Sequence, residues 1–162
     1  MSSDFYTSSI LPYKGIITKI CRSYTFNNED FEDYYQEVCL QIWKSRNNFK
    51  GNSEWSTWVY RISLNVCMTI FKKKKIQKLP LFDSDREITN QPEQYAFEKE
   101  DEINRLYNTI RQLPKVDRAY MLLYLEEKSY KEIAEILGTQ TTNVGVKINR
   151  IKKKLKKLYY GN

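Results

Sequence analysis

Histidine is absent from this chain of 162 residues, and cysteine is scarce. The three cysteines, Cys21, Cys39 and Cys67, are widely spaced and form no CxxC pair. Because zinc sites are built largely from cysteine and histidine, and histidine is the commonest general acid–base residue, this composition argues against a metal centre and against His-based catalysis. Dispersed cysteines in an odd number are typical of buried thiols in a reducing compartment.

Long apolar runs are absent as well. No stretch approaches the roughly 18 apolar residues of a membrane-spanning helix, and the N-terminus has neither the basic segment nor the apolar core of a signal peptide. We therefore expect a soluble, cytoplasmic protein without direct membrane insertion. Strand-like alternation does not persist anywhere, whereas helical spacing does, so the predicted fold class is all-α.

The charges that are present are segregated along the chain. The net charge is +7, which favours a polyanionic partner. Positive residues gather at 72–78 and at the C-terminus, whereas 29–37 and 83–102 are acidic. This distribution predicts separate surfaces for separate partners.

Residues 129–162 have the pattern of two short helices joined by a tight turn. Ser129 with Glu132 predicts a capping box at the start of the first helix, and Gly138 is placed to end it in the left-handed conformation. The second helix is expected to begin at Thr141 or Thr142, whose hydroxyls suit an N-cap. Its apolar stripe recurs at three- and four-residue steps: Val144, Ile148, Ile151, Leu155 and Leu158.

The rest of this second helix is basic. One flank carries Asn143, Lys147, Arg150 and Lys154, Val146 lies nearly opposite the apolar stripe, and no acidic residue follows Thr141. A buried stripe, an exposed N-terminal half and a one-sided set of cations are typical of a DNA recognition helix. A basic helix that is merely solvated remains the alternative.

The first half of the chain predicts three helices. They are expected at about 9–23, 29–44 and from Ser53 or Ser56 to about residue 75, with a turn-rich loop at 47–53. In the second helix an unusual face combines acids with apolar residues: Asp33, Gln36, Glu37 and Leu40, with Trp43 at its edge. This face is either a docking surface or a face on which Leu40 and Trp43 pack against a neighbouring helix.

The long third helix has two distinct faces. Its buried stripe is predicted to contain Val59, Ile62, Val66 and Ile70. A second flank holds Trp58, Arg61, Asn65 and Lys72, a combination that suits a nucleic-acid surface. A lysine-rich helix end that complements the helix dipole would explain the lysines alone.

Residues 79–94 have two prolines and little periodicity, and they are predicted to be a linker. Helices are expected again at 95–112 and 115–127, separated by Leu113 and Pro114. The predicted organisation is therefore two small helical domains, 1–78 and 95–162, of which the second contains the helix-turn-helix.

Three motifs resemble one family when they are taken together. They are EDYYQEV at 32–38 with Leu40 and Trp43, FKGNS at 49–53 followed by TWVYRISLN at 57–65, and LP at 113–114 followed by SYKEIAEILG at 129–138. In this order they resemble the extracytoplasmic-function (ECF) sigma factors, promoter-specificity subunits of bacterial RNA polymerase. The resemblance covers nearly the whole chain.

The resemblance implies three contact surfaces. Polymerase would dock on Asp33, Gln36, Glu37, Leu40 and Trp43. The −10 element would meet Phe49, Lys50, Asn52, Ser53, Trp58, Tyr60, Arg61, Asn65 and Lys72, and in the family the loop and the residue matching Asn65 capture a flipped base. The −35 element would meet Thr141, Thr142, Asn143, Val146, Lys147, Arg150 and Lys154.

The recognition segment departs most from the family pattern. Gly145 lies within the expected helix, at a cost of up to ~1 kcal/mol, and we expect it to permit a close approach to the DNA backbone. Val146 is expected to contact a thymine methyl group, and Lys147 or Arg150 a guanine or a phosphate.

The implied partners are core RNA polymerase, promoter DNA and, in part of the family, an anti-sigma factor. No catalysis, cofactor, metal or small-molecule substrate is expected. Parts of the sequence are also compatible with two other functions. A stand-alone helix-turn-helix regulator leaves 32–65 unexplained and usually needs a dimer seam. A nuclease would need a carboxylate cluster, for which Asp30, Asp33 and Glu37 are the candidates.

Overall fold

The computed structural model describes residues 1–78 and 101–161, without the side chains of 75–78. Every regular element in these ranges is helical, which confirms the predicted all-α class. The predicted linker at 79–94, and residues 95–100 of the helix expected at 95–112, lie outside the described residues. That helix, α5, is described from Glu102 to Ile110, with Asp101 as its N-cap.

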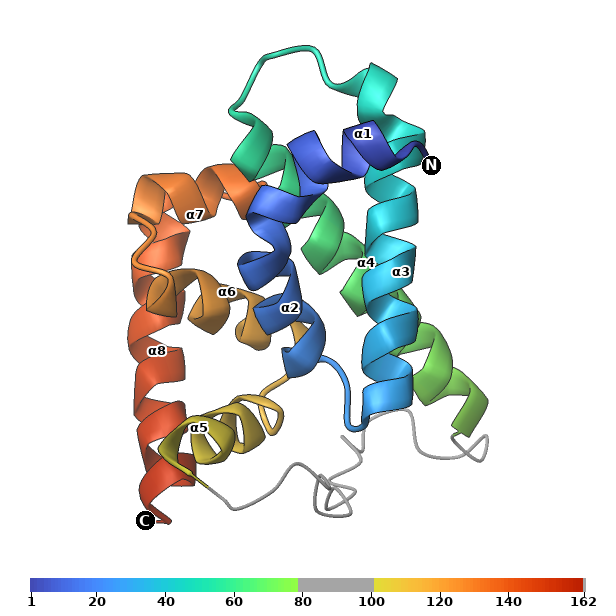
Figure 1. The fold of residues 1–162 in the computed structure, drawn as a ribbon. Coiled ribbons are helices and arrows are strands. Elements are labelled where there is room, and N and C mark those ends of the chain that lie inside the picture. Colours follow the sequence, from blue (N-terminus) through green and yellow to red (C-terminus); the bar gives the residue numbers. More distant parts are fainter. Residues whose placement is uncertain (79–100, 162) are drawn as a thin grey trace.

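The first half is built on three α-helices with a segmented N-terminal stretch before them (Figure 1). In chain order the elements are α1 (Ser3–Phe5), the π-helical turn η1 (Tyr6–Ile10), the 3-10 turn η2 (Leu11–Tyr13), α2 (Lys14–Ser23), α3 (Asn28–Ser45), the 3-10 turn η3 (Arg46–Asn48) and α4 (Trp55–Lys78).

The single helix expected at 9–23 is therefore wrong at its start. Pro12 lies in the first turn of η2 and offers no backbone N–H, so the regular α-helix begins only at Lys14. Helical turns nevertheless continue upstream as far as Ser3.

The core of the first half lies where α2, α3 and α4 meet. Ile17, Val38, Ile42 and Val59 are fully buried there. Free thiols also lie in this core, as expected from the cysteine pattern, and the sulfur atoms of Cys21 and Cys67 are 3.8 Å apart.

The second half consists of α5, α6 (Lys115–Leu125), α7 (Tyr130–Leu137) and α8 (Thr141–Tyr160). The predicted capping box is confirmed: the Glu132 backbone N–H donates to Ser129 Oγ at 3.1 Å, and the Ser129 N–H donates to the Glu132 carboxylate at 3.2 Å. Gly138 has φ 69° and ends α7 as predicted. The N-cap of α8 is Gln140, without a side-chain hydrogen bond, so the predicted cap at Thr141 or Thr142 is wrong.

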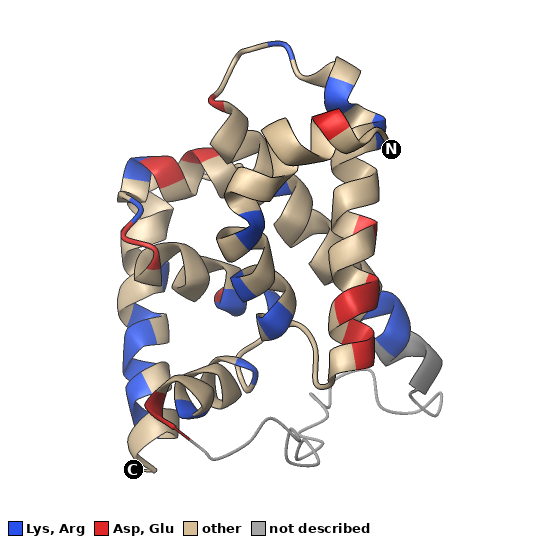
Figure 2. Cartoon of the chain, in the orientation of Figure 1, with Lys and Arg blue, Asp and Glu red and all other residues tan. Residues whose placement is uncertain are grey.

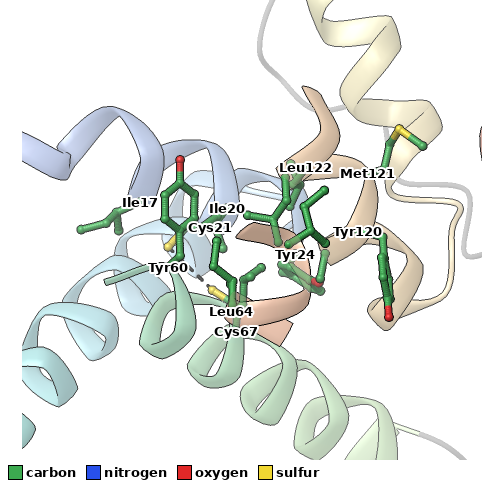
Figure 3. Close-up of a cluster of buried hydrophobic side chains, with 14 of the residues drawn as sticks. Ile17, Ile20, Cys21, Tyr24, Tyr60, Leu64, Cys67, Tyr120, Met121 and Leu122 are labelled. Carbon is green, nitrogen blue, oxygen red and sulfur yellow. Dashed lines mark hydrogen bonds between the residues drawn. The ribbon is translucent and has the colours of Figure 1, made fainter. Parts of the chain in front are cut away.

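The two halves share one continuous apolar core. Helices α2 and α4 of the first half contact α6 of the second half, and α4 also contacts α7. The seam is the part of this core where α2 and α4 meet α6 and α7, and Figure 3 shows Leu122 of α6 there, close to Tyr24 and Leu64. The predicted domains are thus packed side by side in this arrangement.

The seam changes which face of α4 is buried. Of the predicted stripe only Val59 is fully buried, whereas Ile62, Val66 and Ile70 remain half-buried. The most buried side chains lie one step round the helix, at Tyr60, Ser63, Leu64 and Cys67. They face α2 and the helices of the second half. The sequence pattern of α4 alone does not predict that the second half packs against it.

Candidate nucleic-acid interfaces and docking surfaces

The exposed flank of α8 is the first candidate surface. Asn143, Arg150 and Lys154 are exposed, and Val146 is 71% exposed although it is apolar. Lys147 is half-buried because its ammonium group lies 5.3 Å from the centre of the Tyr120 ring. The cations run along the helix without an acidic neighbour on the same element (Figure 2). The structure thus presents the predicted recognition flank to solvent while Val144, Ile148 and Ile151 are buried beneath it.

Gly145 lies close to the first residue of α7. A Cβ atom at this position would lie 3.4 Å from the ring of Tyr130, which is an ordinary van der Waals contact. Packing within the protein therefore does not require a glycine here, and the close approach to the DNA backbone stays a prediction.

The acidic and apolar face of α3 is the second candidate surface. Asp33 and Gln36 are exposed, and Leu40 is 37% exposed although it is apolar. Trp43 instead packs within the protein: its ring meets Phe5 edge-on at 5.2 Å between centroids, and the Arg46 guanidinium lies 3.5 Å from its ring centre. Each interpretation of this face therefore applies to a different residue. Leu40 is exposed, as a docking surface requires, whereas Trp43 packs within the protein.

An open groove of about 570 Å³ runs between α3 and α4. One wall carries Asp33 and Glu37 from the acidic and apolar face of α3, and the other carries Asn65, Lys73 and Lys74 from α4. Lys74 also binds Asp30 at 2.8 Å, which links the acidic start of α3 to the basic end of α4. Asn65 is exposed at this groove, so the predicted base-reading residue adjoins the predicted polymerase surface.

Aromatic residues support the loop before α4. The Phe49 ring packs against Trp55 at 5.1 Å and against Trp58 at 5.6 Å between centroids. Lys50 and Asn52 are exposed beyond this support, and Ser53 is half-exposed. The Trp58 Nε1–H is buried and has no hydrogen-bond partner among the described residues. A buried donor without a partner is uncommon in proteins, and this one lies at the loop predicted to take up a base.

The seam covers two of the predicted −10 contacts. Tyr60 is only 2% exposed, with the Lys128 ammonium group 5.1 Å from its ring centre, so DNA cannot reach it in this arrangement. The Arg61 guanidinium donates to the Glu135 carbonyl oxygen at 2.6 and 3.2 Å. Arg61 was predicted from the pattern of α4 and Tyr60 from the family resemblance, and neither takes account of α7, which contacts α4. Lys72, by contrast, is exposed.

Arg118 is the main seam residue that the sequence analysis missed. It is 5% exposed, and its guanidinium donates to the carbonyl oxygens of Leu113 at 2.7 Å, Arg111 at 2.7 Å and Ser23 at 3.2 Å. It also lies 4.6 Å from the ring centre of Phe71 in α4. The only signal in the sequence was an arginine inside the apolar run of α6.

Tyr24 makes a second polar contact across the seam. Its hydroxyl donates to the Lys115 carbonyl oxygen at 2.5 Å, and burial raises the pKa of this hydroxyl well above its usual value. At the rim, Lys19 binds Glu126 at 2.6 Å. The seam therefore combines apolar burial with hydrogen bonds that fix the relative position of α2 and α6.

Two classes of site have no counterpart in the described residues. Within 1–78 and 101–161, no group of three acidic or cysteine side chains is placed to hold a metal ion. In the same ranges, no helix has the length and apolarity that crossing a bilayer requires.

Comparison with known proteins agrees with the order of the motifs. Residues 10–76 match the family model described as Sigma-70 region 2, and residues 103–155 match the one described as Sigma-70, region 4. The ECF RNA polymerase sigma factor SigW of Bacillus subtilis is 29% identical, over 95% of this chain and 88% of its own. The chain belongs to the ECF family of RNA polymerase sigma factors. Sigma factors are promoter-specificity subunits without catalysis of their own, so the chain is not an enzyme.

Solved structures of sigma factors share this fold. One is RpoE of Bartonella quintana in complex with the anti-sigma factor NepR, with a TM-score of 0.72, 19% identity and 97% of both chains covered. Another is CnrH in complex with the cytosolic domain of CnrY, with a TM-score of 0.70, 16% identity, and 99% of this chain and 91% of that chain covered. The likeness extends over both halves and shows a common architecture.

Proposed function

We propose that this sigma factor acts in the cytoplasm, docks on core RNA polymerase through α3 and reads its promoter with the 49–53 loop, α4 and α8. One observation carries the proposal: the chain exposes an acidic and apolar face on its first half and an acid-free basic flank on its second half. A stand-alone regulator would use the second surface and leave the first without a role. A nuclease is also disfavoured, because Asp30 is engaged by Lys74.

The docking proposal rests on Leu40, an apolar residue that is 37% exposed on the α3 face that also carries Asp33, Gln36 and Glu37. Burying a fully exposed leucine side chain contributes about 1.5–3 kcal/mol, and Leu40, which is 37% exposed, can contribute about a third of this, or about 0.5–1 kcal/mol. Leu40→Ala is therefore expected to weaken binding to core polymerase by about 2- to 5-fold, measured by fluorescence anisotropy of the labelled sigma factor. Leu11→Ala, which removes another exposed leucine from the same half, is the matched control and should bind normally.

The −35 proposal assigns two kinds of contact to α8. Asn143, Val146, Lys147 and Arg150 lie in its N-terminal half and would face base edges or adjacent phosphates, with Thr141 and Thr142 at its start. Lys154 lies further along the same flank and would meet a phosphate.

Lys154→Ala is therefore expected to lower the affinity of holoenzyme for all promoter sequences by a similar factor. It should also reduce the slope of log affinity against log salt by about 1, because one phosphate contact is lost. Lys156→Ala removes an exposed lysine on the opposite side of α8 and should leave the slope almost unchanged. A loss confined to one promoter sequence would instead assign Lys154 to base recognition.

The proposed −10 contacts of Tyr60 and Arg61 require that α7 leave α4. The −35 and −10 elements are about 25 base pairs apart, or roughly 85 Å along straight B-DNA. A compact chain of this length has a radius of gyration of only about 15 Å. We therefore propose that the two halves separate on the promoter, which releases Arg61 from the Glu135 carbonyl.

An anti-sigma factor is the remaining proposed partner. Its support is that RpoE of Bartonella quintana, one of the structural relatives described above, is in complex with an anti-sigma factor. Co-expression with candidate partners, followed by co-purification and a transcription assay, tests whether such a protein binds this chain and silences it.

A further inference from the structure

The first nine residues of the chain lie outside the range 10–76 that the family model matches, yet they are packed against functional elements. Helix α1 and turn η1 lie across the end of the first half, next to the start of α4 and the end of α3 (Figure 1). Phe5 is half-buried there. Its ring meets Trp43 edge-on at 5.2 Å and Trp55 edge-on at 6.2 Å between centroids.

A hydrogen bond reinforces the contact with Trp55. The Trp55 indole N–H donates to the Ser9 carbonyl oxygen at 2.8 Å. Trp55 is the first residue of α4, and Trp43 lies in the last turn of α3. The N-terminal segment thus touches both ends of the 46–54 connection, and Phe5 bridges the two tryptophans across it.

Trp55, which Phe5 and Ser9 contact, also packs against Phe49, one of the residues proposed to bind DNA. The Phe49 ring packs on Trp55, the same ring that Phe5 and Ser9 hold, and also on Trp58. Without a fixed Trp55, Phe49 would lose one of its two aromatic supports. The loop would then have to be ordered when DNA binds, at a cost in conformational entropy.

We propose that Phe5 and Ser9 form a clamp that positions the −10 loop, and that Phe5 is a positioning residue for base capture without touching DNA itself. The inference rests on the proposed role of the 49–53 loop. It assigns a function to a segment that the family match does not include. The clamp acts before DNA arrives, by keeping Phe49, Asn52 and Ser53 in the geometry that accepts a base.

The test uses full-length protein bound to core polymerase. The probe is a fork-junction DNA with a single-stranded −10 region, selected by the wild-type holoenzyme from a randomised pool, and its derivative with an abasic site in place of one −10 base. The ratio of the two affinities measures base capture. Wild type is expected to prefer the intact probe by about 10-fold or more, in line with about 1–3 kcal/mol per recognised base.

Phe5→Ala is expected to reduce this ratio at least threefold while core-polymerase affinity stays the same. Phe5→Leu, which keeps part of the apolar contact, should restore most of the ratio, and Leu11→Ala should match wild type. Hydrogen exchange of the 46–54 amides in the free protein gives a readout without DNA, and it should be faster in Phe5→Ala than in Leu11→Ala.

Two outcomes would overturn the inference, and they differ. If wild type discriminates between the probes and Phe5→Ala discriminates equally well with unchanged exchange at 46–54, the clamp has no positioning role. If wild type itself does not discriminate at any −10 position, the proposed base contact of the loop fails, and the clamp fails with it. Should Phe5→Ala not fold, Trp55→Phe takes its place, because it removes the indole N–H that donates to the Ser9 carbonyl oxygen, and it must show a reduced ratio and faster exchange at 46–54.

Discussion

Replacing Arg118 with methionine is expected to lower the free energy of unfolding by about 3 kcal/mol or more. The guanidinium is buried and donates to three backbone carbonyl oxygens, of which the one on Ser23 lies across the seam. Methionine can fill much of the volume but donates no hydrogen bond, so buried acceptors would lose their partners at about 1–3 kcal/mol each. Urea unfolding followed by circular dichroism measures the change.

The matched control for Arg118 is Arg150→Met. Arg150 lies on the exposed flank of α8, where the same substitution should change stability by no more than about 0.5 kcal/mol. Equal losses in the two variants would show that the hydrogen bonds of Arg118 do not stabilise the seam. A selective loss would show that the buried hydrogen bonds of Arg118, to Leu113 and Arg111 within the second half and to Ser23 across the seam, stabilise the protein.

Replacing Asn65 with alanine is expected to lower −10-dependent promoter opening by about 10- to 100-fold. Asn65 is exposed at the groove between α3 and α4, and its amide can both donate to and accept from a base edge. Extruding a base costs a few kcal/mol of stacking energy, which hydrogen bonds to the flipped base must offset. Without the Asn65 amide, about 1–3 kcal/mol of this offset is lost. Potassium permanganate footprinting of the melted region measures the opening.

Binding to core polymerase should be unchanged in Asn65→Ala. This second readout is informative because Asn65 lines the same groove as Asp33 and Glu37 of the docking face. Thr69→Ala, one turn further along α4 and in the same groove, is the matched control and should open promoters normally. If Asn65→Ala lost polymerase binding together with opening, DNA recognition and docking could not be assigned to separate surfaces.

Local signals in the sequence were sufficient for the helix-turn-helix. The reciprocal bonds of Ser129 and Glu132, the left-handed Gly138 and the exposed flank of α8 are properties of a few neighbouring residues. They do not depend on what packs against the unit, so spacing and capping rules predict them well. For Leu40 the same rules left exposure and packing equally open, and the structure shows it 37% exposed.

Long-range packing accounts for what the sequence did not predict. Tyr60 and Arg61 have side chains that suit a DNA contact, but α7 lies beside them. No pattern within α4 predicts that a helix about 70 residues downstream packs against it. Arg118 was not singled out, because no pattern within α6 indicates that its guanidinium meets Ser23 and Phe71. The ring contact between Phe5 and Trp55 also joins residues whose spacing carries no periodic signal.

Transcription from a promoter selected with this protein is the most direct measurement of its function. Purified chain is mixed with core RNA polymerase that lacks any other sigma factor, and transcripts are mapped on templates with intact or scrambled −10 and −35 elements. Promoter-dependent initiation that requires both elements, and that falls with Leu40→Ala and Asn65→Ala but not with Leu11→Ala, is the predicted result. A chain that neither binds core polymerase nor directs initiation from any template would contradict the account.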